Sequence, residues 1–460
     1  MPLNIWPRQP QTLAVVRQFI VAGSASLSFA AAGMASAWPS PTLPKIVSHD
    51  APVSLNLIEM SRMVSLYYVG NLVSCLPMSY LADNFGRKKI LLYSSLFTIL
   101  SWLIILIATS AVHLYIARFL AGIQLGAIAT VHSIYIGEIS LPEVRGSLSV
   151  LNHFMVSAGA LIMFVVGPFV YYYDLALISL VFPLLFSLTF AAMPESPYYY
   201  MMKEQPELAR KSLFWLRGGI NNIELDMELK QIESFVNSEL KNKSSFKEIF
   251  VSEAPRKAII ISIVFTTMKI LSGFVAINVF ASMTLPHRSF GVLDPNECVI
   301  ILGAVNLVSS LLMVCITDMF ARKLLLYISC TGCGLTMLVV SIWYFLDEKT
   351  SVNTRSTNYL PFTMFLVHVV LYNIGCGNYP GCIKSELFPS HVKTKSCALT
   401  NVIFGIVSFV VIRFYLVVAD REGLYINFIV FAISCFLTVI FTVYYVPETK
   451  GKTLQEIPVA

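Results

Sequence analysis

Long stretches without a charged side chain are the feature that most limits how this chain can fold. Ten stretches of at least 19 residues contain no Asp, Glu, Lys or Arg, and two more reach that length when one cation is allowed inside each. A helix that crosses the hydrocarbon core of a bilayer needs about 20 mostly apolar residues. The sequence therefore predicts an all-α membrane protein with twelve transmembrane helices. The predicted spans are 18–44, 63–82, 90–117, 119–137, 146–173, 175–194, 258–287, 298–317, 324–346, 356–383, 396–419 and 423–447.

Composition supports this interpretation. Of the 460 residues, 56% are hydrophobic and 13% are charged, whereas a soluble protein carries about 25% charged residues. A water-soluble enzyme, a nucleic-acid binder and a disordered chain are therefore disfavoured. Because no nucleophile–base pair or metal cluster stands out in the sequence, we expect no enzymatic activity, cofactor or metal. The expected partners are the lipid bilayer and a small solute, without nucleic acid. The sequence leaves the oligomeric state open, and a monomer is compatible with it.

The placement of Lys and Arg predicts the orientation. When the N-terminus is placed in the cytosol, 23 cations fall in inner segments and 5 in outer segments. Cytosolic loops of membrane proteins carry an excess of Lys and Arg. The sequence therefore predicts a multi-pass protein with both termini in the cytosol.

A polar segment divides the predicted spans into two sets of six. Residues 194–257 hold ten basic and ten acidic side chains, and Pro206–Arg217 and Asn222–Leu240 have the pattern of short amphipathic helices. We interpret this segment as a cytosolic linker. The predicted organisation is a six-helix bundle over 1–193, the linker over 194–257, a second six-helix bundle over 258–446 and a cytosolic tail over 447–460.

The two halves carry matching charge motifs. Asp83 begins a motif after the second span and Asp318 begins a similar one after the eighth, 235 residues later. Two further pairs, Glu138 with Glu386 and Glu195 with Glu448, are separated by 248 and 253 residues. Three motifs at nearly one offset indicate an internal duplication and two pseudo-symmetric bundles, which is the architecture of the major facilitator superfamily.

The motifs themselves resemble those of the sugar porters in that superfamily, the group that contains facilitative glucose transporters and insect trehalose transporters. The resemblance covers nearly the whole chain and implies a location in the plasma membrane. The motifs that carry it are LADNFGRKK at Leu81–Lys89, YIGEISLPEVRG at Tyr135–Gly146, PESP at Pro194–Pro197, ARKSLFWLRG at Ala209–Gly218, SELFPSHVK at Ser385–Lys393 and PETKGKTLQEI at Pro447–Ile457.

This resemblance implies a gating network on the cytosolic side that latches the outward-facing form. The alternative is that the cations only set the topology and are solvated, but the acids recur at the same places as the bases, which favours the network. Four family residues are replaced, by Ser79, Asn84, Tyr198 and Ala321, so we expect a weaker latch than in relatives. The residues predicted to form it are Asp83, Arg87, Arg118, Glu138, Arg145, Glu195, Asp318, Arg322, Glu386, Lys393 and Glu448.

A substrate site between the two halves, near the middle of the membrane, is also implied by the resemblance. The family's eighth-helix Asn and tenth-helix aromatic residue are retained as Asn306 and Tyr372, and His153 stands where the family has a fifth-helix Gln. The tenth helix keeps Gly377 and Pro380, so it can still break. The residues predicted to bind substrate are His153, Lys269, Asn278, Asn306, Tyr372, Asn373, Gly377 and Asn378.

The seventh helix departs most from the family. The sugar-binding pattern Gln-Gln-x-Ser-Gly-x-Asn reads Lys269-Ile-Leu-Ser-Gly-Phe-Val275 here, so all three amides are missing. Asn278 lies about one turn further on and could replace one of them. Lys269 falls near the middle of its span, where a lysine facing apolar surroundings costs about 2.5–3.5 kcal/mol. It either snorkels along the helix or faces a water-filled cavity, and its match to the first Gln favours the cavity.

These observations leave three hypotheses open. No Asp or Glu occurs between residues 11 and 49, whereas proton-coupled sugar porters carry a carboxylate in the first helix. The favoured hypothesis is therefore facilitative uniport of a sugar such as glucose or trehalose by alternating access. The second is transport of another, possibly anionic, small solute, which Lys269 favours. The third is a sensor or degenerate paralogue that does not transport, which the missing amides favour.

Overall fold

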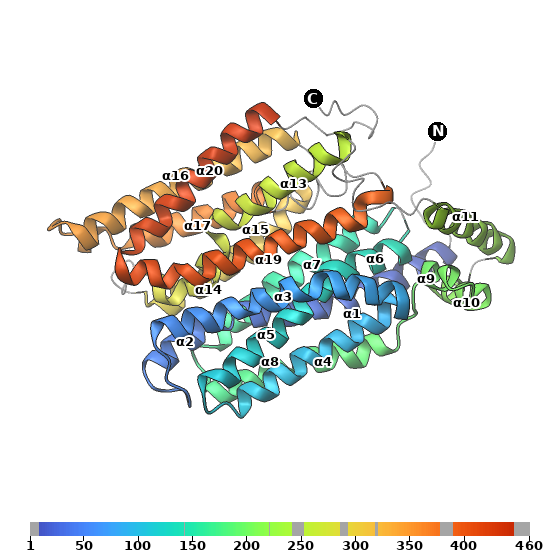
Figure 1. Ribbon diagram of the computed structural model, residues 1–460, viewed down its shortest axis with the longest axis horizontal. Helices are drawn as coiled ribbons and strands as arrows, with labels where there is room; N and C mark the ends of the chain where they lie inside the picture. Colours follow the sequence, from blue (N-terminus) through green and yellow to red (C-terminus); the bar gives the residue numbers. More distant parts are fainter. Residues whose placement is uncertain are drawn as a thin grey trace.

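Long helices run back and forth along the length of the molecule in the computed structural model (Figure 1). The structure describes residues 9–141, 143–219, 221–241, 253–285, 293–317, 321–377 and 390–445. Within these ranges ten helical segments are long and apolar enough to cross a membrane. Two further helices complete the set of twelve predicted spans. Each of them lacks either the length or the apolar composition that the other ten have. α3 (Leu57–Phe85) carries charged residues near both ends, and α17 (Tyr359–Ile374) has only 16 residues.

The first six predicted spans agree with the first group of helices to within about one or two turns at most ends. The interval between the third and fourth spans is an exception, because the turn at 107–110 contains no charged residue to mark it. The helices of this group are α1 (Gln9–Ala37), α2 (Pro39–Val47), α3, α4 (Arg87–Leu106), α5 (Ala111–Ala127), the π-helix η1 (Ile128–His132), α6 (Ser133–Ile139), α7 (Arg145–Val166) and α8 (Tyr172–Ala191).

Local sequence explains where α3 begins and how closely it packs. Asn56 caps its N-terminus, because the Asn56 side chain accepts from the Glu59 N–H while the Glu59 carboxylate accepts from the Asn56 N–H, each at 2.9 Å. Further along, Gly70 of α3 meets Gly122 of α5. A Cβ atom at Gly122 would lie 2.0 Å from the backbone oxygen of Tyr67, so the two helices approach closely only because these residues are small.

The second group of helices matches the remaining spans. Its helices are α13 (Glu253–Leu271), α14 (Phe274–Thr284), α15 (Pro295–Thr317), α16 (Arg322–Lys349), the short 3-10 helix η2 (Arg355–Thr357), α17, α19 (Ser390–Arg421) and α20 (Leu424–Tyr445). In Figure 1 this group, coloured yellow to red, lies along one side of the first group, coloured blue to green.

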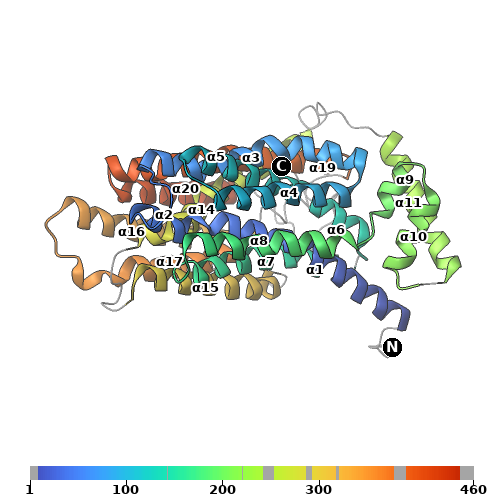
Figure 2. The ribbon, with the colours of Figure 1, turned by 90° about the horizontal axis from the view of Figure 1, so that it is seen from below.

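Three short helices lie beyond one end of both groups (Figure 2). They are α9 (Pro197–Met202), α10 (Pro206–Leu216) and α11 (Asn222–Lys241), and α10 and α11 cover the two segments that have the pattern of amphipathic helices. We call this end of the molecule the linker end. The opposite end carries α2 and is called the α2 end.

Direct contacts join the two groups from the middle of the molecule to the α2 end. There, Ser282 of α14 donates a hydrogen bond to the backbone carbonyl of Ser40 in α2, and the Arg413 guanidinium of α19 donates to the carbonyl of Ile58 at 3.1 Å. Near the middle, the Asn401 amide of α19 donates to the carbonyl of Ala129 in η1 at 3.2 Å. One continuous apolar core, which contains residues of both groups, lies in the same part of the molecule.

Candidate substrate site and gating network

An interruption between α13 and α14 opens the candidate site. α13 ends at Leu271 and α14 begins at Phe274, because Gly273 takes a left-handed conformation with a φ of 91°. A Cβ atom at this position would lie 2.5 Å from the ring of Phe431 in α20. Glycine is therefore required for both the backbone angle and the close packing. Broken helices of this kind place backbone polar groups and helix ends at the binding sites of transporters.

Two aromatic rings meet at this interruption. The Phe274 ring stacks on the Tyr372 ring of α17, with centroids 3.9 Å apart and an interplanar angle of 7°. Tyr372 is buried, and a Cβ atom at Gly377 would lie 2.7 Å from the Tyr372 ring. Gly377 thus makes room for the tyrosine, which is a packing contribution to the site rather than a direct contact with a solute.

Amide side chains form a polar bridge beside the rings. The Asn373 side chain of α17 donates to Asn306 Oδ1 in α15 at 3.0 Å and to the Ser309 hydroxyl at 2.7 Å. Asn306 in turn donates to the Ser157 hydroxyl of α7 at 3.3 Å. Because α7 belongs to the first group of helices and α15 and α17 to the second, this hydrogen-bonded chain crosses between the two groups.

Two cationic or titratable side chains lie nearby. His153 lies on α7, one turn before Ser157 toward the linker end, and its side chain is exposed although it is in the middle of a membrane-spanning segment. Lys269, in the last turn of α13, is half-buried and interacts electrostatically with His153. An exposed histidine that interacts with a residue of the other group must face the space between the groups. The prediction that Lys269 faces the interior rather than the lipid stays a prediction, which this interaction favours.

The remaining predicted residues contribute less than expected. The Asn278 amide donates to the Phe274 carbonyl within its own helix at 2.9 Å, so its donor is already engaged. Asn378 lies outside the described residues. The sequence analysis did not identify Ser157, Ser309 or Phe274. For Ser157 a signal was available, because it lies four residues after His153 and so faces the same side of a helix.

A second cluster, at the linker end, is centred on Arg87. This nearly buried guanidinium bonds to Asp83 Oδ1 and to Glu138 Oε2, both at 3.1 Å. Glu138 also accepts a hydrogen bond from the Ser196 hydroxyl. Buried ion pairs hold their geometry when the remaining polar atoms are also satisfied, and here a hydroxyl supplies one of those partners.

Glu195 completes this cluster by capping a helix. Its carboxylate accepts from the Lys88 N–H at 3.0 Å and from the Ser196 N–H at 2.9 Å. It therefore lies at the N-terminus of α4, where a negative charge is stabilised by the helix dipole. Gly86 makes this possible, since a Cβ atom there would lie 2.4 Å from the Glu195 carboxylate. The structure thus brings together Asp83, Arg87, Glu138 and Glu195, all from the linker-end side of the first group.

Arg118 does not belong to this network, and its assignment to the linker end is wrong. It lies inside α5, and its guanidinium donates to the carbonyl of Ala35 near the end of α1, toward the α2 end. The assignment placed Arg118 at the boundary between the third and fourth predicted spans, whereas Arg118 is only 2% exposed and is covered by aromatic rings.

The other predicted members of the network stay predictions. Arg145 is exposed at the first position of α7. Asp318, Glu386 and Glu448 lie outside the described residues. Arg322 and Lys393 lie in α16 and α19, but their side chains are also outside the described part of the structure. Among the described residues, no group of three or more His, Cys, Asp or Glu side chains is placed to hold a metal ion.

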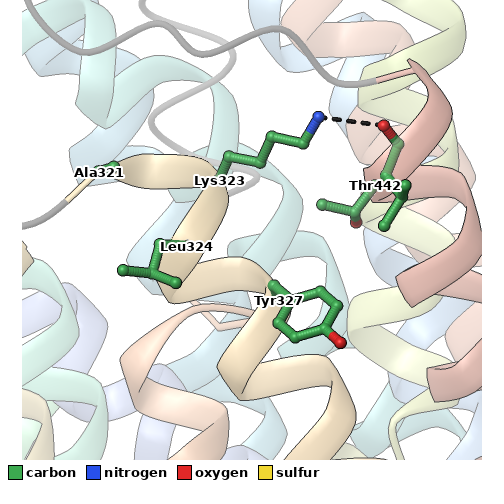
Figure 3. Close-up of a pocket in the computed structure, with 6 residues that line it drawn as sticks. Ala321, Lys323, Leu324, Tyr327 and Thr442 are labelled. Atoms are coloured by element: carbon green, nitrogen blue, oxygen red, sulfur yellow. Dashed lines mark hydrogen bonds between the residues drawn. The ribbon is translucent and has the colours of Figure 1, made fainter.

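A pocket of about 350 Å³ lies at the linker end of the second group (Figure 3). Lys323 of α16 crosses it and donates to the carbonyl of Val443 in α20 at 3.0 Å. The pocket is lined only by the beginning of α16 and the end of α20. It is therefore separate from the candidate substrate site at α13, α14, α15 and α17.

Comparison with solved structures identifies the fold. The structure is similar to the partially occluded inward-open xylose transporter XylE from E. coli, with a TM-score of 0.77, 19% identity and coverage of 95% of this chain and 100% of the other. It is also similar to the proton:xylose symporter XylE of the major facilitator superfamily, bound to 6-bromo-6-deoxy-D-glucose, with a TM-score of 0.76, 19% identity and coverage of 96% and 98%. The predicted twelve-helix major facilitator fold is confirmed.

Sequence comparison identifies the family. The model of the family described as "Sugar (and other) transporter" matches residues 28–460, and the chain belongs to this family, whose members are transporters and not enzymes. It is 28% identical to the facilitated trehalose transporter Tret1 of Bombyx mori over 97% of this chain and 87% of that protein. It is 27% identical to Tret1 of Drosophila mojavensis over 99% of this chain, but it spans only 52% of that longer protein.

Proposed function

We propose that this protein is a facilitative carrier that moves a neutral sugar, such as glucose or trehalose, by alternating access. The observation that carries the proposal is the hydrogen-bonded chain Asn373–Asn306–Ser157 between the two groups of helices, next to the stacked Phe274 and Tyr372 rings. Amides and hydroxyls next to an aromatic wall provide the few placed polar groups and apolar surface typical of sites for small ligands.

The chemistry of α1 supports uniport over proton coupling. The described residues of α1 contain no Asp or Glu. The contact that α1 offers to the buried Arg118 is the backbone carbonyl of Ala35, which cannot carry a proton at physiological pH. Coupling to a proton gradient needs a side chain that binds and releases a proton, and the contact between α1 and Arg118 contains no carboxylate that could do so.

We also propose that the linker end faces the cytosol and that the protein resides in the plasma membrane. The ratio of 23 to 5 cations between the two sides supports the orientation. Contacts between the two groups from the middle to the α2 end support access of solute from the linker end. An exposed His153 near the middle of the molecule is consistent with that access.

The experiment that tests this function is uptake of labelled glucose and trehalose by the purified protein in liposomes. We expect saturable uptake that equilibrates and does not exceed the external concentration. Asn306→Ala should reduce it about ten-fold, because truncation leaves buried partners unpaired. Asn427→Ala is the matched control: Asn427 is also buried in the second group, where its amide bonds to the Tyr415 carbonyl at 3.0 Å. Accumulation above the external concentration, abolished by a protonophore, would contradict uniport.

Transport of an anionic solute is the second candidate, and the position of Lys269 next to His153 favours it. Uptake of organic anions in the same liposomes, lost in Lys269→Gln while sugar uptake is absent in both proteins, would select this function. A folded protein that transports neither class would support the third hypothesis, that of a sensor or a non-transporting paralogue.

A further inference from the structure

A charge is buried inside the first group of helices without a carboxylate beside it. The Arg118 guanidinium is 2% exposed, and the ionisable groups that interact with it electrostatically are Tyr67 and Tyr68, both neutral at physiological pH. Its one hydrogen bond among the described residues goes to the Ala35 carbonyl. The Nε and Nη2 donors of Arg118 are buried with no hydrogen-bond partner in the described part of the chain. Buried charges in proteins are ordinarily paired and hydrogen-bonded.

Other unpartnered donors gather at the same place. The ring of Trp38 lies 5.7 Å from the Arg118 guanidinium carbon, 6.3 Å from the Trp102 ring and 6.2 Å from the Tyr172 ring. The indole N–H groups of Trp38 and Trp102 and the hydroxyl of Tyr172 are all buried and, among the described residues, also lack partners. Trp38 lies between α1 and α2, Trp102 in the last turns of α4, Arg118 inside α5 and Tyr172 at the start of α8; Figure 1 shows these helices side by side. We call Trp38, Trp102, Arg118 and Tyr172 the donor cluster.

The donor cluster contains almost only hydrogen-bond donors. Indole and guanidinium groups only donate hydrogen bonds, and of its members only the Tyr172 hydroxyl can also accept one. Cation–π contacts of Arg118 with Trp38 and with Tyr67, whose ring is 4.6 Å away, offset part of the cost of burying the charge. They do not supply hydrogen-bond acceptors, and Nε and Nη2 of Arg118 stay without one among the described residues.

We propose that the donor cluster binds one small monovalent anion, for which chloride is the physiological representative. An anion neutralises the charge of Arg118 and accepts hydrogen bonds from several N–H and O–H groups at once. Hydrogen bonds to a charged acceptor are stronger than those between neutral groups. A water molecule satisfies two of these donors but leaves the charge unpaired. The members of the donor cluster all belong to the first group of helices and their unpartnered atoms are buried, so the proposed site is separate from the candidate substrate site between the groups. Its occupancy stabilises the packing of α1 and α2 against α4, α5 and α8.

The test is equilibrium binding of radiolabelled chloride to the purified full-length protein, together with the Tm measured in chloride and in gluconate at one ionic strength. We expect saturable binding near one chloride per chain and a Tm that rises with chloride and then levels off, because a ligand of the folded state stabilises it. Bromide should replace chloride, whereas gluconate should not.

Three variants locate the site. Arg118→Gln removes the charge and should abolish chloride binding. Trp102→Phe keeps an aromatic ring but removes one donor, and it should weaken the affinity about ten-fold, as expected for the loss of one hydrogen bond to a charged partner. Trp343→Phe is the matched control: Trp343 is buried in the second group with its indole N–H bonded to the Thr357 hydroxyl at 3.0 Å, and the variant should bind chloride as the parent does.

The proposal is overturned if the folded parent protein binds no chloride saturably and its Tm is equal in chloride and gluconate, which would leave water as the occupant. It is also overturned if Trp102→Phe and Trp343→Phe have the same chloride affinity as the parent, which would place any chloride elsewhere. If Arg118→Gln does not fold, the comparison of the two tryptophan variants still decides the question.

Discussion

Replacing Gly273 with alanine tests the interruption between α13 and α14 most directly. The substitution forces a residue with a side chain to adopt a φ of 91°, which costs about 1–2 kcal/mol. The new Cβ atom would lie 2.5 Å from Cδ2 of Phe431, whereas carbon atoms in contact are about 3.5–4.0 Å apart. The Phe431 ring would therefore have to move by about 1 Å.

That movement is resisted by the surrounding rings. Phe431 is 3% exposed and packs against Tyr415 and Phe428, with ring centroids 6.4 Å and 6.3 Å away. Overpacking of this kind costs about 1–3 kcal/mol. The two effects together amount to about 2–5 kcal/mol, which predicts a Tm lower by about 2–5 °C for a chain of 460 residues. Uptake should also fall, because Lys269 and Phe274 flank the interruption.

The assay is thermal unfolding in detergent followed by intrinsic fluorescence, with uptake measured in liposomes. Gly23→Ala is the control, since Gly23 lies within α1 and a Cβ atom there meets nothing within 4 Å. Alanine is favoured over glycine in a helix by about 0.8–1.0 kcal/mol, so this variant should be as stable as the parent or slightly more stable. If Gly273→Ala keeps the Tm and uptake of Gly23→Ala, the interruption and its contact with Phe431 are not as described.

Three further predictions address other parts of the molecule. Glu138→Gln weakens the buried pair with Arg87 and should cost about 1–3 kcal/mol. Asp226→Asn weakens the exposed ion pair of Asp226 with Arg210, at 3.2 Å in the linker, and should cost under about 1 kcal/mol; equal Tm values would argue against a buried network. Gly122→Ala places a Cβ atom 2.0 Å from a backbone oxygen of α3 and should reduce the yield of folded protein, which size-exclusion chromatography measures; a normal yield would argue against the close packing of α3 and α5. His153→Cys should react with a membrane-impermeant thiol reagent added from the linker end and be protected by substrate; reaction from the other side alone would contradict the proposed access.

Much of the fold could be predicted from the sequence because the bilayer penalises charge so strongly. Charge-free stretches located α7, α8 and α20 to within a few residues at most of their ends, and the pattern in the linker predicted α10 and α11. The same reasoning failed between α4 and α5. The turn there contains no charge, while Arg118 is buried inside the helix that follows, where Trp38 and Tyr67 cover it. At Arg118 a charge does not mark a helix end, because aromatic rings cover it.

The candidate site could be predicted in part. The resemblance to sugar porters implies Asn306 and Tyr372, and Asn373 is predicted beside them, but their mutual contacts depend on how α15 and α17 pack, which no local pattern encodes. Ser157 was missed for a related reason. A serine within a membrane helix usually bonds to its own backbone, and only the approach of α15 makes it a partner of Asn306. The contribution of a residue to a site between two groups of helices is set by tertiary structure.

If the solute binds at Asn306 as proposed, the contact between Asn306 and Ser157 couples solute binding to the separation of the two groups. In this structure the Asn306 amide donates a hydrogen bond to Ser157 of the first group and accepts one from Asn373 of the second. A solute that bonds to Asn306 must replace at least one of them. If the solute replaces the hydrogen bond to Ser157, the direct contact between α7 and α15 is lost. The solute itself then connects the two groups of helices. A ligand shifts a conformational equilibrium only by the difference in its affinity for the two states. A solute bound in this way therefore favours the conformation in which it contacts both groups at once. The difference in its affinity for the two conformations arises between α7 and α15.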